Sequence, residues 1–334
     1  MDYYGTIGPA CASAECLRRM REAGMTGIRV NLSHGTLENQ QEHLALIREA
    51  GIPKILIDLQ GPELRIGDLT EPLELPEGAV LRLGRDGVPC PAALISAVRK
   101  GQRLLLDDGK MEAEVEQAQP DYLLCTVRRG GVLRSRKSLA VPGVVLHTPT
   151  LTAEDRQNLE QARQYGVTGV MLPFVRGAED LLTLRDALEK LGIGDIRIFA
   201  KIENREGVQA LTGLLPYVDE VVIARGDLGN AMPLWELPAV QKYIAGVCRS
   251  SGVPFMVVTQ LLDSMQTRAI PTRAEVCDVY NAALDGASSL MLTGETAVGN
   301  YPVEAMRVLV KTAQQAERMG PVNNAEQGCR ALRE

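Results

Sequence analysis

Two charged side chains stand at the end of an apolar run, where a buried strand would need apolar ones. The segment IRIFAKIEN, residues 196–204, carries Lys201 and Glu203 in its last four positions. Because side chains alternate between the two faces of a strand, these two point to the same side. They could form a structural ion pair at the end of a strand, or they could be the charged groups of a catalytic site.

Other apolar runs also end in polar side chains, namely Arg29, Asn31, Ser33, His34, Asp58, Arg65, Arg225, Asp227, Thr259, Gln260, Thr293 and Glu295. Glu203 and Asp227 are two carboxylates from successive runs with no histidine or cysteine nearby, which is typical of a site for Mg²⁺ or Mn²⁺. Lys201 and Arg29 beside such a metal would favour phosphate. Phosphoryl transfer depends mainly on this kind of charge neutralisation. The backbone N–H groups of the turn ARGDLG could hold a carboxylate or phosphate of the substrate.

Eight apolar runs must position these side chains. They cover residues 3–9, 27–35, 54–61, 167–174, 196–204, 218–227, 253–260 and 287–295. Helix-like stretches such as SAECLRRMREAG lie between most of them, so the pattern indicates a parallel sheet covered by helices. Eight such units predict an α/β fold of the (β/α)8 TIM barrel type, whose active site lies at the carboxyl ends of the strands. A doubly wound open sheet is the alternative.

One segment interrupts this alternation after the third run. Between residues 64 and 145, short alternating runs such as GAVLRLG and DYLLCTVRRGG are separated by glycine and proline. This texture predicts a small all-β domain inserted in a barrel loop, where it could act as a lid. The expected domains are therefore a catalytic barrel of residues 1–63 and 146–334 and an inserted lid of residues 64–145.

Composition excludes several classes of function. The formal charge is -6 and the basic residues are scattered, so neither nucleic acid nor a membrane surface is expected as a partner. No apolar run approaches the roughly 20 residues of a membrane span, and the first residues, MDYYGTIGPA, do not show the basic and apolar regions typical of a signal peptide. Seven cysteines without a C-x-x-C pair fit reduced thiols. We expect a cytoplasmic protein.

Eight segments together resemble signature segments of one known family. They are TIGPACASAECLRRMREAGMTGIRVNLSHG, IDLQGPELRIG, LLLDDGKMEAEV, VPGVVLHTPTLTAEDRQNL, KIENREGV, VVIARGDLG, VVTQLLDSMQTRAIPTRAEVCDV and SLMLTGETAVGNYPVEA. In order and spacing they resemble the pyruvate kinases, over roughly residues 5 to 318. The resemblance implies phosphoryl transfer from phosphoenolpyruvate to ADP, giving pyruvate and ATP, with Mg²⁺ (or Mn²⁺) and K⁺ as cofactors.

The resemblance also assigns roles to single residues. Lys201 would stabilise the transferring phosphoryl group, Arg29 would bind the substrate phosphate, and Thr259 would sit near the carbon that is protonated. Mg²⁺ would be held by Glu203 and Asp227, and the substrate carboxylate by the backbone of Gly226 and Asp227. A K⁺ site would consist of Asn31, Ser33, Asp58 and Leu59, and Glu63 is typical of K⁺-dependent members. The nucleotide would be contacted by Asn31, His34, Arg65 and Lys137. Asp108 would lie in the lid.

Several positions depart from the family pattern. Gln60 replaces a usual lysine and Leu59 a threonine, Pro173 replaces a serine, Ala231 a glutamate and Thr293 a serine. The chain also stops at Glu334, so the family's C-terminal regulatory domain is expected to be absent, and a homodimer through the barrel is the expected oligomer.

Two other functions fit the same residues. One is a Mg²⁺-dependent lyase or a phosphotransferase acting on another enol phosphate or oxo acid, which the changes at Gln60, Pro173 and Ala231 would favour. The other is a non-catalytic paralogue that binds phosphoenolpyruvate, although intact Lys201 and Glu203 argue against it.

Overall fold

The computed structural model describes residues 1–320 except 34, 63, 108, 143 and 145–147. The chain divides into two compact units. The first, called the barrel unit, comprises Met1–Gly61, Thr150–Arg225 and the chain from Pro238 onward, and the second unit comprises Pro62–Pro149 and Gly226–Leu237.

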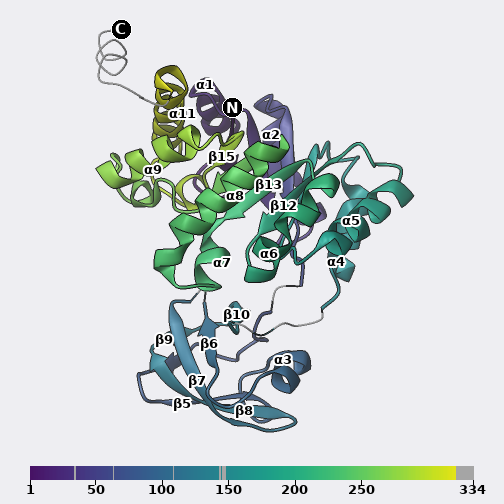
Figure 1. Cartoon of the computed structure of the whole chain (residues 1–334), viewed down its shortest axis with the longest axis vertical. Helices are drawn as coiled ribbons and strands as arrows, with labels where there is room; N and C mark the ends of the chain where they lie inside the picture. The colour runs from purple at the N-terminus through teal and green to yellow at the C-terminus, as the bar shows by residue number, and fades with distance from the viewer. Residues whose placement is uncertain (34, 63, 108, 143, 145–147, 321–334) are drawn as a thin grey trace. The chain divides into compact units, whose positions relative to one another are not determined.

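The barrel unit is built on a closed parallel barrel (Figure 1). In the described residues its strands are β1 (Asp2–Thr6), β2 (Gly27–Asn31), β3 (Lys54–Asp58), β11 (Gly169–Leu172), β12 (Arg197–Ile202), β13 (Glu220–Ala224), β14 (Phe255–Val258) and β15 (Ser289–Met291). Their order around the barrel is β1-β15-β14-β13-β12-β11-β3-β2. Each predicted run contains one of these strands or overlaps it, so the (β/α)8 fold is confirmed and the open sheet is excluded.

Buried apolar side chains fill the interior of the barrel. They are Tyr4, Leu56, Met171, Phe199, Val222, Ala224, Met256, Val258 and Met291. Because side chains alternate along a strand, the residue two positions after each of these faces the same side. Asp58 therefore follows Leu56, and Lys201 follows Phe199, on the inward face at the carboxyl ends of β3 and β12. The fold thus places these charged residues at the mouth of the barrel, where active sites of this architecture lie.

Helices follow most strands and cover the barrel. They are α1 (Ala14–Glu22), α2 (Gln41–Glu49), α4 (Ala153–Gln161), α5 (Ala178–Lys190), α6 (Arg205–Leu214), α8 (Leu237–Ser251), α9 (Arg273–Leu284), α10 (Gly294–Ala297) and α11 (Pro302–Met319), with short 3-10 turns at Glu38–Gln40, Leu215–Tyr217 and Asp263–Gln266. Side-chain caps begin several of them; Ser13, for example, accepts the backbone N–H of Cys16 at 3.1 Å at the start of α1. Within the part of the chain described, no helix is both long and apolar enough to cross a membrane.

The second unit is mainly antiparallel sheet around its own apolar core. Its elements are β4 (Leu73–Leu75), β5 (Val80–Gly84), α3 (Ala92–Ala97), β6 (Arg103–Leu106), β7 (Met111–Ala118), β8 (Tyr122–Arg129), β9 (Gly131–Leu133), β10 (Leu139–Ala140), most of α7 (Arg225–Asn230) and the 3-10 turn Leu234–Glu236. The expectation of an all-β segment missed α3. This helix forms because Leu94 and Ile95 bury against the sheet, a tertiary contact that a six-residue stretch does not reveal by itself.

A buried polar cluster closes the opposite end of the barrel. Glu220 at the start of β13 accepts hydrogen bonds from Oγ of Ser289 and, at 3.2 Å, from Nη2 of Arg197. Burial raises the pKa of Glu220 despite these partners. Polar groups at this end of the architecture are ordinarily structural.

Candidate active site

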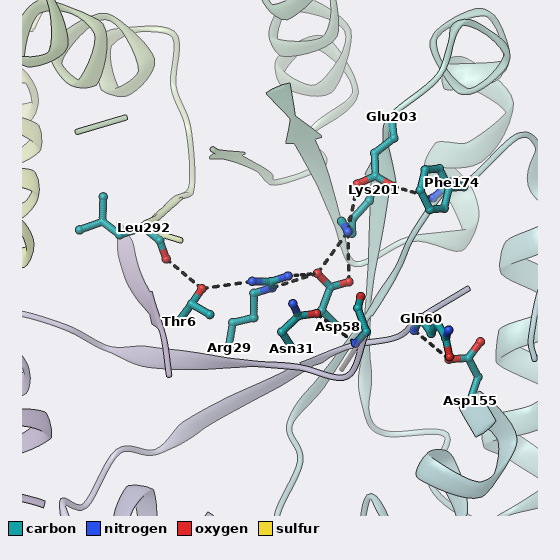
Figure 2. Close-up of polar contacts among 11 residues, drawn as sticks. Thr6, Arg29, Asn31, Asp58, Gln60, Asp155, Phe174, Lys201, Glu203 and Leu292 are labelled. Atoms are coloured by element: carbon teal, nitrogen blue, oxygen red, sulfur yellow. Dashed lines mark hydrogen bonds and ion pairs between the residues drawn. The ribbon is translucent and has the colours of Figure 1, made fainter. Parts of the chain in front are cut away.

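A buried carboxylate connects two cationic side chains at the mouth of the barrel. The carboxylate of Asp58 accepts hydrogen bonds from Nε and Nη2 of Arg29 at 2.9 and 2.6 Å. Nζ of Lys201 lies 3.2 and 3.1 Å from the two oxygens of the same carboxylate. Figure 2 shows both cationic side chains directed at Asp58 from different strands. The predicted phosphate-binding residues, Arg29 and Lys201, are therefore held together by a third residue.

Burial determines the electrostatics of this group. Asp58 is 2% exposed, and the side chains of Arg29 and Lys201 are each 14% exposed. Burial by itself raises the pKa of Asp58, but the charges and hydrogen bonds of Lys201 and Arg29 outweigh it and hold this pKa below its ordinary value. Asp58 is thus a buried carboxylate that holds the positive charges of Arg29 and Lys201 close together.

Glu203 lies on the other side of Lys201 (Figure 2). Its Oε1 is 3.0 Å from Nζ of Lys201, and its Oε2 accepts the backbone N–H of Phe174 at 2.8 Å. Phe174 adopts a φ of 53°, a left-handed conformation that is uncommon for a non-glycine residue. The charged pair of the segment IRIFAKIEN is therefore in contact, and backbone from the loop after β11 fixes the carboxylate.

The residues predicted to bind K⁺ come from the ends of β2 and β3. Asn31 and Asp58 are register partners in these neighbouring strands, and Oδ1 of Asn31 accepts the backbone N–H of Ser33 at 3.2 Å. The backbone N–H of Leu59 donates to the carbonyl of Met171 at 3.2 Å, which anchors this residue to β11. Amide, hydroxyl, carbonyl and carboxylate oxygens are the donors that hard cations prefer, so the donor set fits such an ion.

Glu203 also fits a divalent cation, since it is a carboxylate with a fixed orientation. Among the described residues, no group of three or more His, Cys, Asp and Glu side chains could hold a metal ion. A site built on Glu203 therefore needs donors besides a cluster of protein carboxylates, which substrate oxygens would provide.

Asp155 is a site residue that the sequence did not single out. It is fully buried, and its two oxygens accept the backbone N–H groups of Gln60 at 2.9 Å and Gly61 at 3.1 Å. The same side chain completes the capping box of α4 with Thr152. The T-x-x-D pattern signals the helix cap. Its second use, holding the loop after β3, depends on tertiary contact.

Pro173, which departs from the family pattern, packs against the glycine that follows Gln60, a second departing position. A Cβ added at Gly61 would lie 2.4 Å from Cγ of Pro173, so Pro173 packs directly on this glycine. Gly61 also has a φ of 59°. Gln60, with its backbone held by Asp155, precedes this contact. The loops after β3 and β11 are thus fitted to each other at the positions where the chain is unusual.

Thr259 and Glu295, which follow the last two strands, differ in burial and contacts. Thr259 follows β14 with a φ of 78° and is half-buried. Glu295 is 1% exposed and accepts the backbone N–H groups of Leu262 at 3.1 Å and Thr293 at 2.9 Å. Glu295 therefore holds two loops of the barrel mouth by hydrogen bonds to their backbone.

The remaining predicted residues lie in the second unit or outside the described residues. Gly226, Asp227, Arg65 and Lys137 belong to the second unit. There, the guanidinium of Arg65 donates to the carbonyl of Arg136 at 2.8 Å, and Nζ of Lys137 is 2.8 Å from Oδ1 of Asp107. His34, Glu63 and Asp108 lie outside the described residues.

Comparison with known proteins identifies the family. The model of the pyruvate kinase barrel domain matches residues 2–306. The chain belongs to the pyruvate kinase family. The resemblance carried by the eight sequence segments is thereby confirmed.

Individual members of the pyruvate kinase family match over most of the chain. A pyruvate kinase of Geobacillus stearothermophilus is 40% identical over 329 residues, which cover 94% of this chain and 56% of that protein. Pyruvate kinase PKLR of Homo sapiens is 39% identical, with 93% of this chain and 59% of that protein covered. A pyruvate kinase of Chlamydia pneumoniae is 37% identical, with 94% and 68% covered. The chain thus spans little more than half the length of the first two relatives.

Proposed function

We propose that the chain is a phosphotransferase of pyruvate kinase type, which converts phosphoenolpyruvate and ADP to pyruvate and ATP. The observation that carries this proposal is the buried group of Arg29, Asp58, Lys201 and Glu203, in which one carboxylate holds two cations side by side. Membership of the family and the position of the group at the carboxyl ends of the strands support it.

The cations would bind and stabilise the phosphoryl group. In the reaction the bond between phosphorus and the enol oxygen breaks, a bond to an oxygen of ADP forms, and the enolate carbon then takes a proton. Arg29 would hold the phosphate, and Lys201 would stabilise charge on the transferring group and on the enolate oxygen. Because Asp58 and Glu203 already fix Lys201, little reorganisation is needed when that charge develops.

Other residues would complete the site. Mg²⁺ would be held by Glu203 and Asp227. K⁺ would be held by Asn31, Ser33, Asp58 and Leu59. When bound, these cations would supply positive charge near the phosphate oxygens. The backbone of Gly226 and Asp227 would bind the substrate carboxylate, and Thr259 would serve protonation of the carbon. The nucleotide would be contacted by Asn31, His34, Arg65 and Lys137, with the inserted domain as a lid. The dimer through the barrel stays a prediction.

A coupled assay tests the proposal. Purified protein is incubated with phosphoenolpyruvate, ADP, Mg²⁺ and K⁺ while pyruvate and ATP are measured, beside Lys201→Met and the control Lys54→Met. Lys54 pairs with Asp2 at 2.6 Å at the opposite end of the barrel. We expect equal amounts of pyruvate and ATP, a loss of roughly 10²- to 10³-fold in kcat for Lys201→Met, and no comparable loss for the control.

Four outcomes would contradict the proposal. Pyruvate formed without ATP, or turnover only with other enol phosphates or oxo acids, would indicate the alternative enzyme and give the change at Pro173 a role in specificity. Binding of phosphoenolpyruvate without any turnover would indicate a non-catalytic protein. Full activity in Lys201→Met would remove the central residue from the mechanism.

A further inference from the structure

We infer that Arg225 is a positioning residue for the step at the substrate carbon, because it fixes the backbone of Thr259 and Gln260 in a strained conformation. The inference rests on the proposed function, in which Thr259 serves protonation of the enolate. That proposal gives no role to Arg225 or to the strained backbone. The role of Arg225 is inferred from its hydrogen bonds to the backbone after β14, and the strain is inferred from the φ angles of Thr259 and Gln260.

The strain lies in two consecutive residues. Thr259 has a φ of 78° and Gln260 a φ of 55°, and neither is a glycine. A β-branched residue such as threonine rarely adopts a positive φ, because its Cβ then crowds the backbone. Strained residues of this kind persist only where surrounding contacts impose them, and they concentrate at functional sites. Some group must therefore hold this turn.

Arg225 supplies that contact. Its Nε and Nη2 donate to the carbonyl oxygen of Thr259 at 3.0 and 2.8 Å, and Nη2 also donates to the carbonyl of Gln260 at 2.9 Å. Its Nη1 donates to Oδ2 of Asp278 in α9 at 2.7 Å. All three nitrogens of the guanidinium are thus in use, and the side chain is only 10% exposed.

The planar guanidinium is suited to this task. Its N–H groups point in fixed directions within one plane, so an orientation set by Asp278 also sets the directions toward the two carbonyls. A lysine could donate to one of these carbonyls but could not hold both and the carboxylate with the same rigidity. Arg225 also directly precedes Gly226 and Asp227 in the chain, the residues proposed to hold the substrate carboxylate.

The prediction concerns the proton transfer more than substrate binding. If the backbone of Thr259 shifts, the carbon and its proton donor lose alignment, and a displacement of about 1 Å can cost roughly 100-fold in rate. The residues proposed to contact ADP are not part of this turn. Loss of Arg225 should therefore lower kcat while the KM for ADP changes little.

The experiment measures the carbon step directly as well as overall turnover. Pyruvate is incubated with the protein, Mg²⁺, K⁺ and inorganic phosphate in D₂O, and replacement of methyl protons by deuterium is followed by proton NMR. In this exchange a C–H bond breaks, its proton passes to the group that serves as acid and base, and its electron pair enters the enolate. That group exchanges its proton with D₂O and then returns a deuteron to the carbon. Arg225→Gln, Arg225→Lys and Asp278→Asn are compared with the wild type.

A control arginine tests for general damage to the barrel. Arg163 also combines a carboxylate, Asp195 at 3.0 Å, with a backbone carbonyl, that of Gly192 at 3.4 Å, but its side chain is 57% exposed. Arg163→Gln should therefore leave both rates unchanged. Thermal unfolding of each variant is recorded beside the rates, and where Arg225→Gln fails to fold, Arg225→Lys and Asp278→Asn provide the test.

We expect Arg225→Gln to lower kcat and proton exchange together by roughly 10- to 100-fold, with the KM for ADP within about two-fold of the wild type. Arg225→Lys should recover part of both rates, and Asp278→Asn should reduce them less than Arg225→Gln. If folded Arg225 variants show the same proton exchange rate and kcat as the wild type, the inference about Arg225 is wrong and the proposed function is unaffected. Absence of any turnover in the wild type would overturn the proposed function and, with it, this role of Arg225.

Discussion

Replacing Asp58 with asparagine removes the negative charge between Arg29 and Lys201. Asp58 is 2% exposed and accepts hydrogen bonds at 2.9 and 2.6 Å from the arginine and at 3.2 and 3.1 Å from the lysine. An asparagine keeps one acceptor oxygen and turns an NH₂ group toward a cation. Removing one partner of a buried ion pair costs about 3–5 kcal/mol. Because Glu203 still pairs with Lys201, we expect the lower end, about 3 kcal/mol.

This cost can be converted to a shift of the unfolding temperature. Unfolding entropy is about 2.1 cal/mol/K per residue, which for 334 residues amounts to roughly 0.7 kcal/mol/K. A loss of about 3 kcal/mol therefore lowers Tm by roughly 4 °C. Thermal unfolding followed by circular dichroism at pH 7 measures it.

The stability difference between the wild type and Asp58→Asn should also depend on pH. The pKa of Asp58 is lowered in the folded protein, since the charges of Lys201 and Arg29 outweigh burial, which acts in the opposite direction. The contribution of this carboxylate to stability is therefore complete above its unfolded pKa of about 3.9 and is lost as the pH falls through the folded value. The difference in stability between wild type and Asp58→Asn should be constant above about pH 5 and shrink below about pH 4.

A surface carboxylate serves as the control for Asp58→Asn. Asp195 pairs with Arg163 at the surface, where ion pairs contribute little, so Asp195→Asn should leave the midpoint unchanged. Two results would refute the reasoning: an Asp58→Asn variant as stable as the wild type at pH 7, or a stability difference that persists without change down to pH 3. Either would mean that the two cations do not depend on this carboxylate.

Two further predictions concern neighbouring carboxylates. Asp155→Asn should lower the free energy of unfolding by about 1–3 kcal/mol, because one of the backbone N–H groups of Gln60 and Gly61 loses its acceptor. Chemical unfolding measures this change. An unchanged unfolding midpoint would contradict the prediction. Glu203→Gln should raise the Mg²⁺ concentration needed for half-maximal turnover by about ten-fold or more, since a charged oxygen donor is lost. A Mg²⁺ titration equal to that of the wild type would exclude Glu203 as a ligand.

The periodicity of the chain was sufficient to predict the barrel. Each strand is a local apolar run that a helix-like stretch separates from the next, and both features can be read within about ten residues. The position of the site follows from the same pattern, because polar residues at the carboxyl ends of parallel strands must meet at one end of a barrel. Lys201 and Glu203 were identified in this way, and they are in contact.

The partners of these residues could not be predicted from local pattern. Asp58, assigned from the sequence to a K⁺ site, also carries the ion pairs with Arg29 and Lys201. Strand β11 separates β3 from β12 in the barrel, so the contact between Asp58 and Lys201 is not one between neighbouring strands. It exists only because the closed barrel brings residues 143 positions apart to one place.

Because hydrophobic periodicity is a local property, the amino-acid sequence was enough to predict the fold and the end of the barrel at which the candidate site lies. How the groups of that site are held depends on contacts that form only in the folded barrel. Phe174, Thr259 and Gln260 adopt positive φ without any glycine to signal it, since contacts with distant residues impose those conformations. Asp155 and Arg225 likewise gain their roles from backbone groups far along the chain, and only the folded barrel brings those groups within hydrogen-bonding distance.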